Sequence, residues 1–84
     1  MKTNDLKKGA EVVLRGTGWK AIIADNARGN TRIATVYGFE TETGSVYSHD
    51  IEYFVDVDGG LVRIEHTDAQ KKLRKQVEEL ARGL

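Results

Sequence analysis

Residues 11–37 read EVVLRGTGWKAIIADNARGNTRIATVY, and their pattern favours a β-rich fold. Three runs rich in aliphatic and β-branched residues, 11–15, 19–25 and 31–37, are separated by Gly-Thr-Gly and Asn-Ala-Arg-Gly-Asn. Runs of this composition are typical of strands. The glycines and asparagines between them tolerate the positive φ angles that turns require. We therefore predict three consecutive strands joined by short turns.

The β pattern continues beyond this stretch, less regularly. Polar and acidic residues come first, then alternating valines, then the tight-turn signal Asp-Gly-Gly. The elements expected here, in chain order, are a long loop (38–45), a short strand (46–48), a 3₁₀ turn (49–52), a strand (53–58), a tight turn (58–60) and a last strand (61–65).

The spacing of apolar residues changes in the final segment and predicts a helix over about 67–82. Thr67 and Gln70 have the spacing of a capping box. The apolar residues that follow recur every three or four positions and form one stripe: Ala69, Leu73, Val77, Leu80 and Leu84. A stripe this short is weak for a coiled coil. We expect it to pack on the strands, with a homodimer through the helix as the alternative to a monomer.

The length of 84 residues allows one small domain, 1–84. A core of this size is too small for two full sheets. We therefore expect a mainly β fold, a small barrel of five or six short antiparallel strands over about 6–65, followed by the C-terminal amphipathic helix. Closing the barrel would remove exposed sheet edges.

The formal net charge is zero, but the charges are unevenly distributed along the chain. Residues 1–37 carry seven basic and three acidic side chains, residues 38–70 carry one basic and eight acidic, and residues 71–84 carry five basic and two acidic. The neutral total argues against general binding of nucleic acid. The acidic middle between two basic ends leaves local charged surfaces possible.

The chain contains no cysteine, which excludes disulfides, thiol catalysis and cysteine-bound metals. No apolar run approaches the roughly 18 residues that span a membrane. The opening MKTNDLKKG lacks the apolar core of a signal peptide. We expect a cytoplasmic protein, in a bacterial host cell, that requires no cofactor, metal or membrane.

Two segments resemble SH3-like barrels of the KOW type. Residues 5–30, DLKKGAEVVLRGTGWKAIIADNARGN, contain the pattern Leu-x-x-Gly-x-x-Val-x-Leu before a second strand. Residues 44–54, GSVYSHDIEYF, resemble the strand–3₁₀–strand step that closes such barrels. The chain is also similar to small proteins of tailed phages and prophages, which share the Gly-Trp strand start, the Asp-Asn-x-x-Gly-Asn loop and the Glu-His-Thr helix start. The resemblance implies an SH3-like barrel and no particular activity.

Aromatic and basic residues lie close together in the first half of the chain. Small barrels bind single-stranded nucleic acid by stacking bases on aromatic rings along a positive groove. The first hypothesis is therefore a non-enzymatic binding module for a macromolecule, with nucleic acid ranked first. Its surface would comprise Trp19, Lys20, Arg28, Arg32, Tyr37 and Tyr47.

The acidic middle supports a second hypothesis, a protein-interaction factor that inhibits or modulates a host protein. Complementary charge speeds the encounter with a basic partner. The carboxylates of this alternative surface are Glu40, Glu42, Asp50 and Glu52, within the acidic segment 38–58.

His49 and Asp50 form the pair most suited to acid–base chemistry. Adjacent strand residues point to opposite faces, and neither a nucleophile nor a cofactor motif accompanies them. His66 lies just before the helix, but it has no metal-ligand spacing to His49. We expect no enzymatic activity, no catalytic residue and no metal site.

Overall fold

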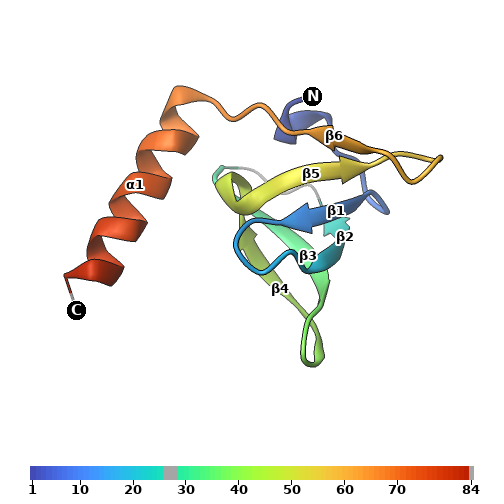
Figure 1. Cartoon of the computed structure of the whole chain (residues 1–84), viewed down its shortest axis with the longest axis horizontal. Helices are drawn as coiled ribbons and strands as arrows, with labels where there is room; N and C mark the ends of the chain where they lie inside the picture. The colour runs from blue at the N-terminus through green and yellow to red at the C-terminus, as the bar shows by residue number, and fades with distance from the viewer. Residues whose placement is uncertain (26–28, 84) are drawn as a thin grey trace.

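The computed structural model describes residues 1–25 and 29–83. The described residues form a mainly β fold, a single sheet of six antiparallel strands and one C-terminal helix (Figure 1). The elements are η1 (Thr3–Asp5), β1 (Glu11–Leu14), β2 (Lys20–Asp25), β3 (Thr31–Tyr37), β4 (Thr41–Tyr47), η2 (Ser48–Asp50), β5 (Ile51–Val55), β6 (Leu61–Arg63) and α1 (Asp68–Arg82).

The strand order is β4-β3-β2-β1-β5-β6, so β4 and β6 are edges and the sheet is open. The closed barrel expected from the sequence is therefore not observed. Alternate residues of β1, β2 and β3 are buried, as expected for strands with one face toward the core and one toward solvent. The buried hydrophobic side chains are Leu6, Val12, Leu14, Ala21, Ile23, Ala34, Ile51 and Ile64.

Strand β4 corrects the prediction of a long loop over 38–45. Residues 41 to 47 pair one by one with β3. Apolar and polar residues do not alternate in β4, because this edge strand is mostly exposed. Strand β5 also begins at Ile51, two residues before the predicted start, because Ile51 pairs with Leu14 of β1. The predicted 3₁₀ turn is confirmed one residue earlier, at η2.

Helix α1 is confirmed, including its capping box. The Thr67 hydroxyl accepts a hydrogen bond from the Gln70 backbone, and the Gln70 side chain accepts one from the Thr67 backbone. None of the helices in the described part of the chain has the length and apolar character needed to cross a membrane.

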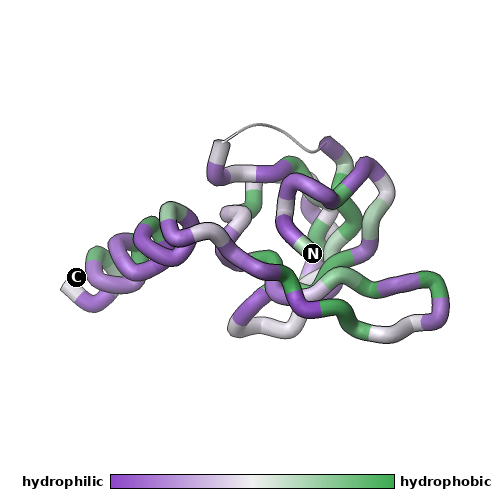
Figure 2. The backbone as a smooth tube through the Cα atoms, turned by 90° about the horizontal axis from the view of Figure 1, so that it is seen from above, coloured by the Kyte–Doolittle hydropathy of each residue, from purple (hydrophilic) through white to green (hydrophobic). Residues whose placement is uncertain are grey.

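The expectation that the helix stripe packs on the strands is wrong. Helix α1 lies to one side of the sheet and contacts mainly η2 (Figures 1 and 2), and Leu80 is 71% exposed. Polar contacts orient the segment before the helix: the Glu65 amide donates to the Met1 carbonyl, and His66 is hydrogen-bonded to the Ile51 carbonyl. These bonds direct the chain outward before the stripe begins. Leu84, the last residue of the stripe, lies outside the described residues.

Candidate functional site

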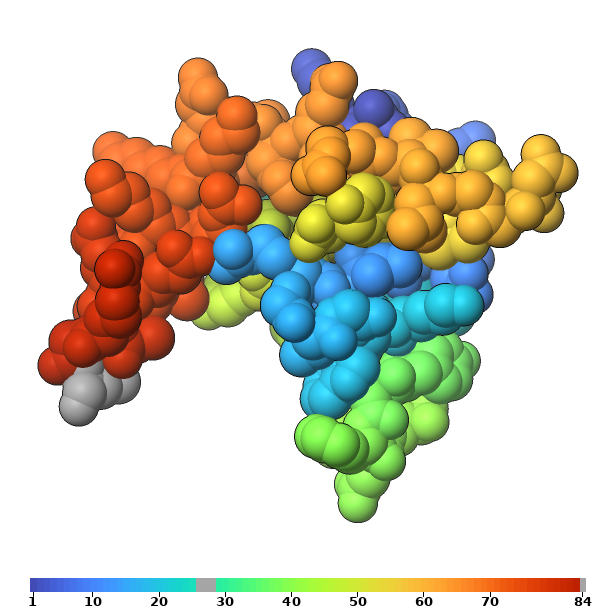
Figure 3. Space-filling view, in the orientation of Figure 1, coloured from blue at the N-terminus to red at the C-terminus, as the bar shows by residue number. Residues whose placement is uncertain are grey.

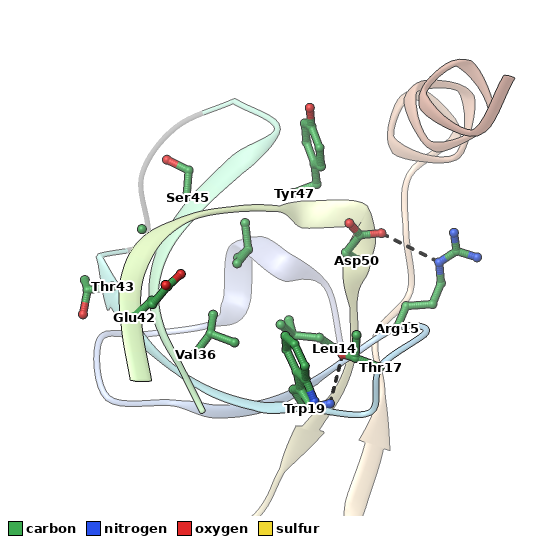
Figure 4. A pocket seen from close by; sticks show the side chains of 12 residues that line it. Leu14, Arg15, Thr17, Trp19, Val36, Glu42, Thr43, Ser45, Tyr47 and Asp50 are labelled. Carbon is green, nitrogen blue, oxygen red and sulfur yellow. Dashed lines mark hydrogen bonds and ion pairs between the residues drawn. The ribbon is translucent and has the colours of Figure 1, made fainter. Parts of the chain in front are cut away.

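A hollow of about 380 Å³ lies between the β1–β2 turn and strand β4 (Figure 4). Its apolar wall comes from Leu14, Val36 and Val46. Trp19 and Tyr47 lie on opposite sides of it, and the carboxylates Glu42 and Asp50 belong to its remaining sides. We call this feature the Trp19–Tyr47 hollow. It joins aromatic, apolar and acidic surface in one place.

Trp19 is positioned by the turns on either side of it. Gly16 and Gly18 have φ angles of 84° and 70°, which glycine adopts without steric cost. The Trp19 amide donates to the Thr17 hydroxyl at 3.2 Å. The indole then lies against Gly38, and Phe39 meets it edge-on with ring centroids 5.4 Å apart. The indole therefore has a defined place at the edge of the hollow.

We predict that Gly38→Ala displaces the Trp19 ring. A Cβ at this position would lie 2.7 Å from two ring carbons, closer than atoms can approach. We expect a loss of about 1–3 kcal/mol in the free energy of unfolding, typical of overpacking, and a shifted emission of Trp19, the only tryptophan. Urea unfolding followed by fluorescence measures both quantities.

Gly44→Ala is the matched control, because a Cβ there meets no atom within 4 Å. Equal effects of the two substitutions would show that the contact between Gly38 and Trp19 does not position the indole.

His49 supports the opposite side of the hollow. Its ring stacks on Tyr47 with centroids 4.8 Å apart, and its Nδ1 atom is hydrogen-bonded to the Asn30 amide nitrogen at 3.2 Å. Its Nε2 atom lies 3.7 Å from Asp50 Oδ1. Only 2% of the residue is exposed, and this burial lowers the pKa of His49 and favours its neutral form. The arrangement suits a neutral ring that holds Tyr47 in place by stacking against it.

Arg15 is shared between two carboxylates at the rim of the hollow. Its Nε atom lies 3.7 Å from Asp50 Oδ1, and its Nη2 atom donates to Glu78 of α1. The hydrogen bond from Arg15 lowers the pKa of Glu78. No ion pair involving Glu42 occurs within residues 1–25 and 29–83. The local charge of the hollow is therefore negative.

The structure brings together residues from both predicted surfaces. Trp19 and Tyr47 of the aromatic–basic set and Glu42 and Asp50 of the acidic set line the same hollow. Glu40 lies beside it, in a smaller depression that Trp19, Phe39 and Glu42 also line. The remaining members lie elsewhere: Lys20 and Tyr37 are cross-strand partners on β2 and β3, and Glu52 is half-buried on β5.

The predicted surface also contained two arginines, Arg28 and Arg32. Arg28 lies outside the described residues. Arg32 is only 2% exposed, so its assignment to an exposed surface is wrong. Its guanidinium donates to the carbonyls of Gly29 and Thr31 at 2.9 and 2.8 Å and to the Asn4 side chain at 2.7 Å.

Arg32 is buried because it is one of the alternate residues of β3 whose side chains point toward the core. Ala34 and Val36, two and four residues later, are on the same face of the strand and pack in or against the core. This alternation was a sequence signal that could have identified Arg32 as an interior residue. Sequence reasoning also missed Phe39, which is 97% exposed at the β3–β4 turn, and Arg15, whose contact with Glu78 has no local signal.

Comparisons with protein-family models, with curated proteins and with solved structures each found no match to this chain. In the part of the chain that the structure describes, no three histidine, aspartate or glutamate side chains gather as metal ligands would.

Proposed function

We propose that this protein is a non-enzymatic binding module that recognises a basic segment of a partner protein. The observation that carries the proposal is the composition of the Trp19–Tyr47 hollow, where an aromatic and apolar wall meets two carboxylates. This is the protein-interaction hypothesis from the acidic segment, narrowed to Glu42 and Asp50 and joined to the two aromatic residues.

The chemistry of the hollow suits a lysine or arginine side chain. The alkyl part of such a side chain buries on apolar surface while its charged end stays polar. The indole of Trp19 attracts a cation placed over its face. Glu42 has no competing cation among the described residues, and Arg15 compensates only part of the charge of Asp50 because it also binds Glu78.

Binding of single-stranded nucleic acid is the second candidate. The observation in its favour is a cluster of accessible aromatic rings beside a cation: Lys20 pairs across the strands with Tyr37, and Phe39 packs edge-on against Trp19. Bases stack on such rings. Arg32 is unavailable for phosphate contacts, which leaves Lys20 as the exposed cation of the predicted set among the described residues.

The proposal also includes an SH3-like fold, a phage or prophage origin, a cytoplasmic location and a homodimer as the alternative to a monomer. An SH3-like fold is supported by the strand–3₁₀–strand order of β4, η2 and β5. A phage or prophage origin and a cytoplasmic location rest on the sequence patterns alone. A homodimer through α1 is compatible with the exposed Leu73 and Leu80.

The test is a fluorescence titration, because Trp19 is the only tryptophan and lies in the hollow. The probes are a short peptide of alternating lysine and valine, its glutamate–valine counterpart and a single-stranded oligothymidylate. We expect the basic peptide to change the Trp19 emission and its affinity to fall with salt. Glu42→Lys is expected to weaken this binding about five- to tenfold, since it replaces attraction by repulsion.

Glu79→Lys is the control, an equal charge change at an exposed carboxylate on α1 outside the hollow. Failure of the basic peptide to bind at low salt would refute the proposal. Binding of the oligonucleotide that Lys20→Glu abolishes and Glu42→Lys leaves intact would transfer the function to the second candidate.

A further inference from the structure

We propose that strand β4 binds the partner's basic segment by strand addition, so that the segment becomes a seventh strand beside β4. This inference rests on the proposed function and specifies how the partner's main chain is held. Strand addition combines main-chain hydrogen bonds along a sheet edge with side-chain pockets at alternate positions. Both components are present on β4.

The direction of the β4 backbone groups follows from the pairing register. The Ser48 amide donates to the Asn30 carbonyl, and the Gly38 amide donates to the Glu40 carbonyl. Residues 41 to 47 pair with β3 without a register shift between these two hydrogen bonds. Because hydrogen-bonded and non-hydrogen-bonded pairs alternate along an antiparallel ladder, the even-numbered residues of β4 are the ones that exchange hydrogen bonds with β3. The amides and carbonyls of Thr41, Thr43 and Ser45 therefore face away from β3. In the described chain, these backbone groups have no hydrogen-bond partner.

This edge lacks the features that usually protect a sheet edge. Natural edges are shortened, bulged, covered, or blocked by proline and lysine. Strand β4 has seven residues paired with β3 without a register shift, and its sequence TETGSVY contains neither proline nor lysine. The other edge, β6, has only three residues, and the chain beside it is bridged by Lys2 and Glu65. Figure 3 shows the β3–β4 hairpin, in green, projecting clear of α1.

The open edge of β4 and the Trp19–Tyr47 hollow lie along the same strand. Residues 42 to 47 of β4 line the Trp19–Tyr47 hollow, and smaller depressions continue it toward each end of the strand. Successive side chains of an added strand point to opposite faces. Every second side chain of the partner would therefore meet the hollow (Figure 4), next to Trp19 and Glu42.

Charge selects a basic partner over a second copy of this chain. Strand β4 contains Glu42 and no basic residue, Glu40 precedes it, and Asp50 lies across the hollow. Pairing β4 with the β4 of a second copy would bring these like charges together, which is unfavourable. A segment with lysine or arginine at alternate positions would neutralise them.

The test uses proline at a position where the ladder with β3 does not need the amide. Ser45→Pro removes an outward-facing N–H and keeps every β3–β4 hydrogen bond, because the Ser45 amide points away from β3. Ser45→Ala removes the side chain only. We expect Ser45→Pro to weaken binding of the lysine–valine peptide at least about tenfold more than Ser45→Ala does, the effect of losing one or two main-chain hydrogen bonds.

Two further measurements keep the result independent of how the proline variant folds. The same peptide with its alternate amides N-methylated is expected to lose binding to the wild-type protein. Hydrogen exchange of the Thr43 and Ser45 amides in the wild-type protein is expected to slow when the unmodified peptide is bound.

The outcomes separate this inference from the proposed function. Peptide binding that Glu42→Lys weakens, without an effect of Ser45→Pro, of N-methylation or on amide exchange, overturns strand addition and leaves the proposed function standing. No binding of the basic peptide overturns both. A dimer mass in light scattering that Ser45→Pro converts to a monomer would assign the edge to a second copy and overturn the basic partner.

Discussion

Arg32→Ala is expected to lower the free energy of unfolding by about 2–4 kcal/mol, because it removes a buried side chain together with the three hydrogen bonds that this side chain donates. Three acceptors would lose the hydrogen bond from Arg32: the carbonyls of Gly29 and Thr31 and the side-chain oxygen of Asn4. The guanidinium ties η1 to the start of β3, so the loss would affect two segments far apart in the chain. Burial also lowers the pKa of Arg32, since the charged form is desolvated.

Urea denaturation of the purified variants measures this effect. Lys20→Ala is the control, because Lys20 is an exposed cation of the same predicted surface and its side chain makes no hydrogen bond within the described residues. Arg32→Lys keeps the charge but cannot reproduce the three-way geometry of a guanidinium, and we expect an intermediate loss. A stability of Arg32→Ala equal to wild type would contradict the structural role assigned to Arg32.

Ile51→Ala is expected to lower the free energy of unfolding by about 2–5 kcal/mol, the range for truncating a buried isoleucine. Ile51 is fully buried and belongs to the core cluster with Leu14 and Leu6. It also begins β5, where its pairing with Leu14 follows a register shift in β1. The cavity would therefore open at the junction of η2 and β5, directly behind the wall of the hollow.

The same denaturation experiment checks this prediction, with Val57→Ala as its control. Val57 is fully exposed in the β5–β6 turn, so its truncation removes no packing. We expect Ile51→Ala to weaken peptide binding as well, because η2 carries Asp50. A loss below about 1 kcal/mol would place Ile51 outside the cooperative core.

The proposed strand addition depends on the openness of the sheet. A closed barrel would pair both edges of the sheet and leave side chains and loops as its binding surface. In this chain β4 ends the sheet on one side, and the β1–β2 turn with Trp19 lies across the Trp19–Tyr47 hollow from it. The free edge and the hollow therefore belong to one surface.

Much of the architecture was predictable because it depends on neighbours in the chain. The runs of aliphatic and β-branched residues in 11–15, 19–25 and 31–37 predicted three strands, which the structure forms over 11–14, 20–25 and 31–37. Thr67 with Gln70 predicted the start of α1. These features follow from side-chain period and local capping, which act within a few residues. Trp19, Tyr47, Glu42 and Asp50 were also identified as candidates from residue type alone.

The remaining features depend on contacts between distant residues. Strand β4 has little apolar alternation and is held by its ladder with β3. Helix α1 has an amphipathic sequence, yet its direction depends on bonds at Glu65 and His66 and on the pairing of Arg15 with Glu78.

The local sequence established a β-rich chain with a capped C-terminal helix, because strand period and helix capping are short-range properties. The tertiary fold established which side chains share a surface: it turned Arg32 inward, gathered Trp19 with Glu42 and Asp50, and left the β4 edge unpaired. The physical reason is that burial and backbone pairing depend on which strands become neighbours, and short-range patterns do not encode that choice.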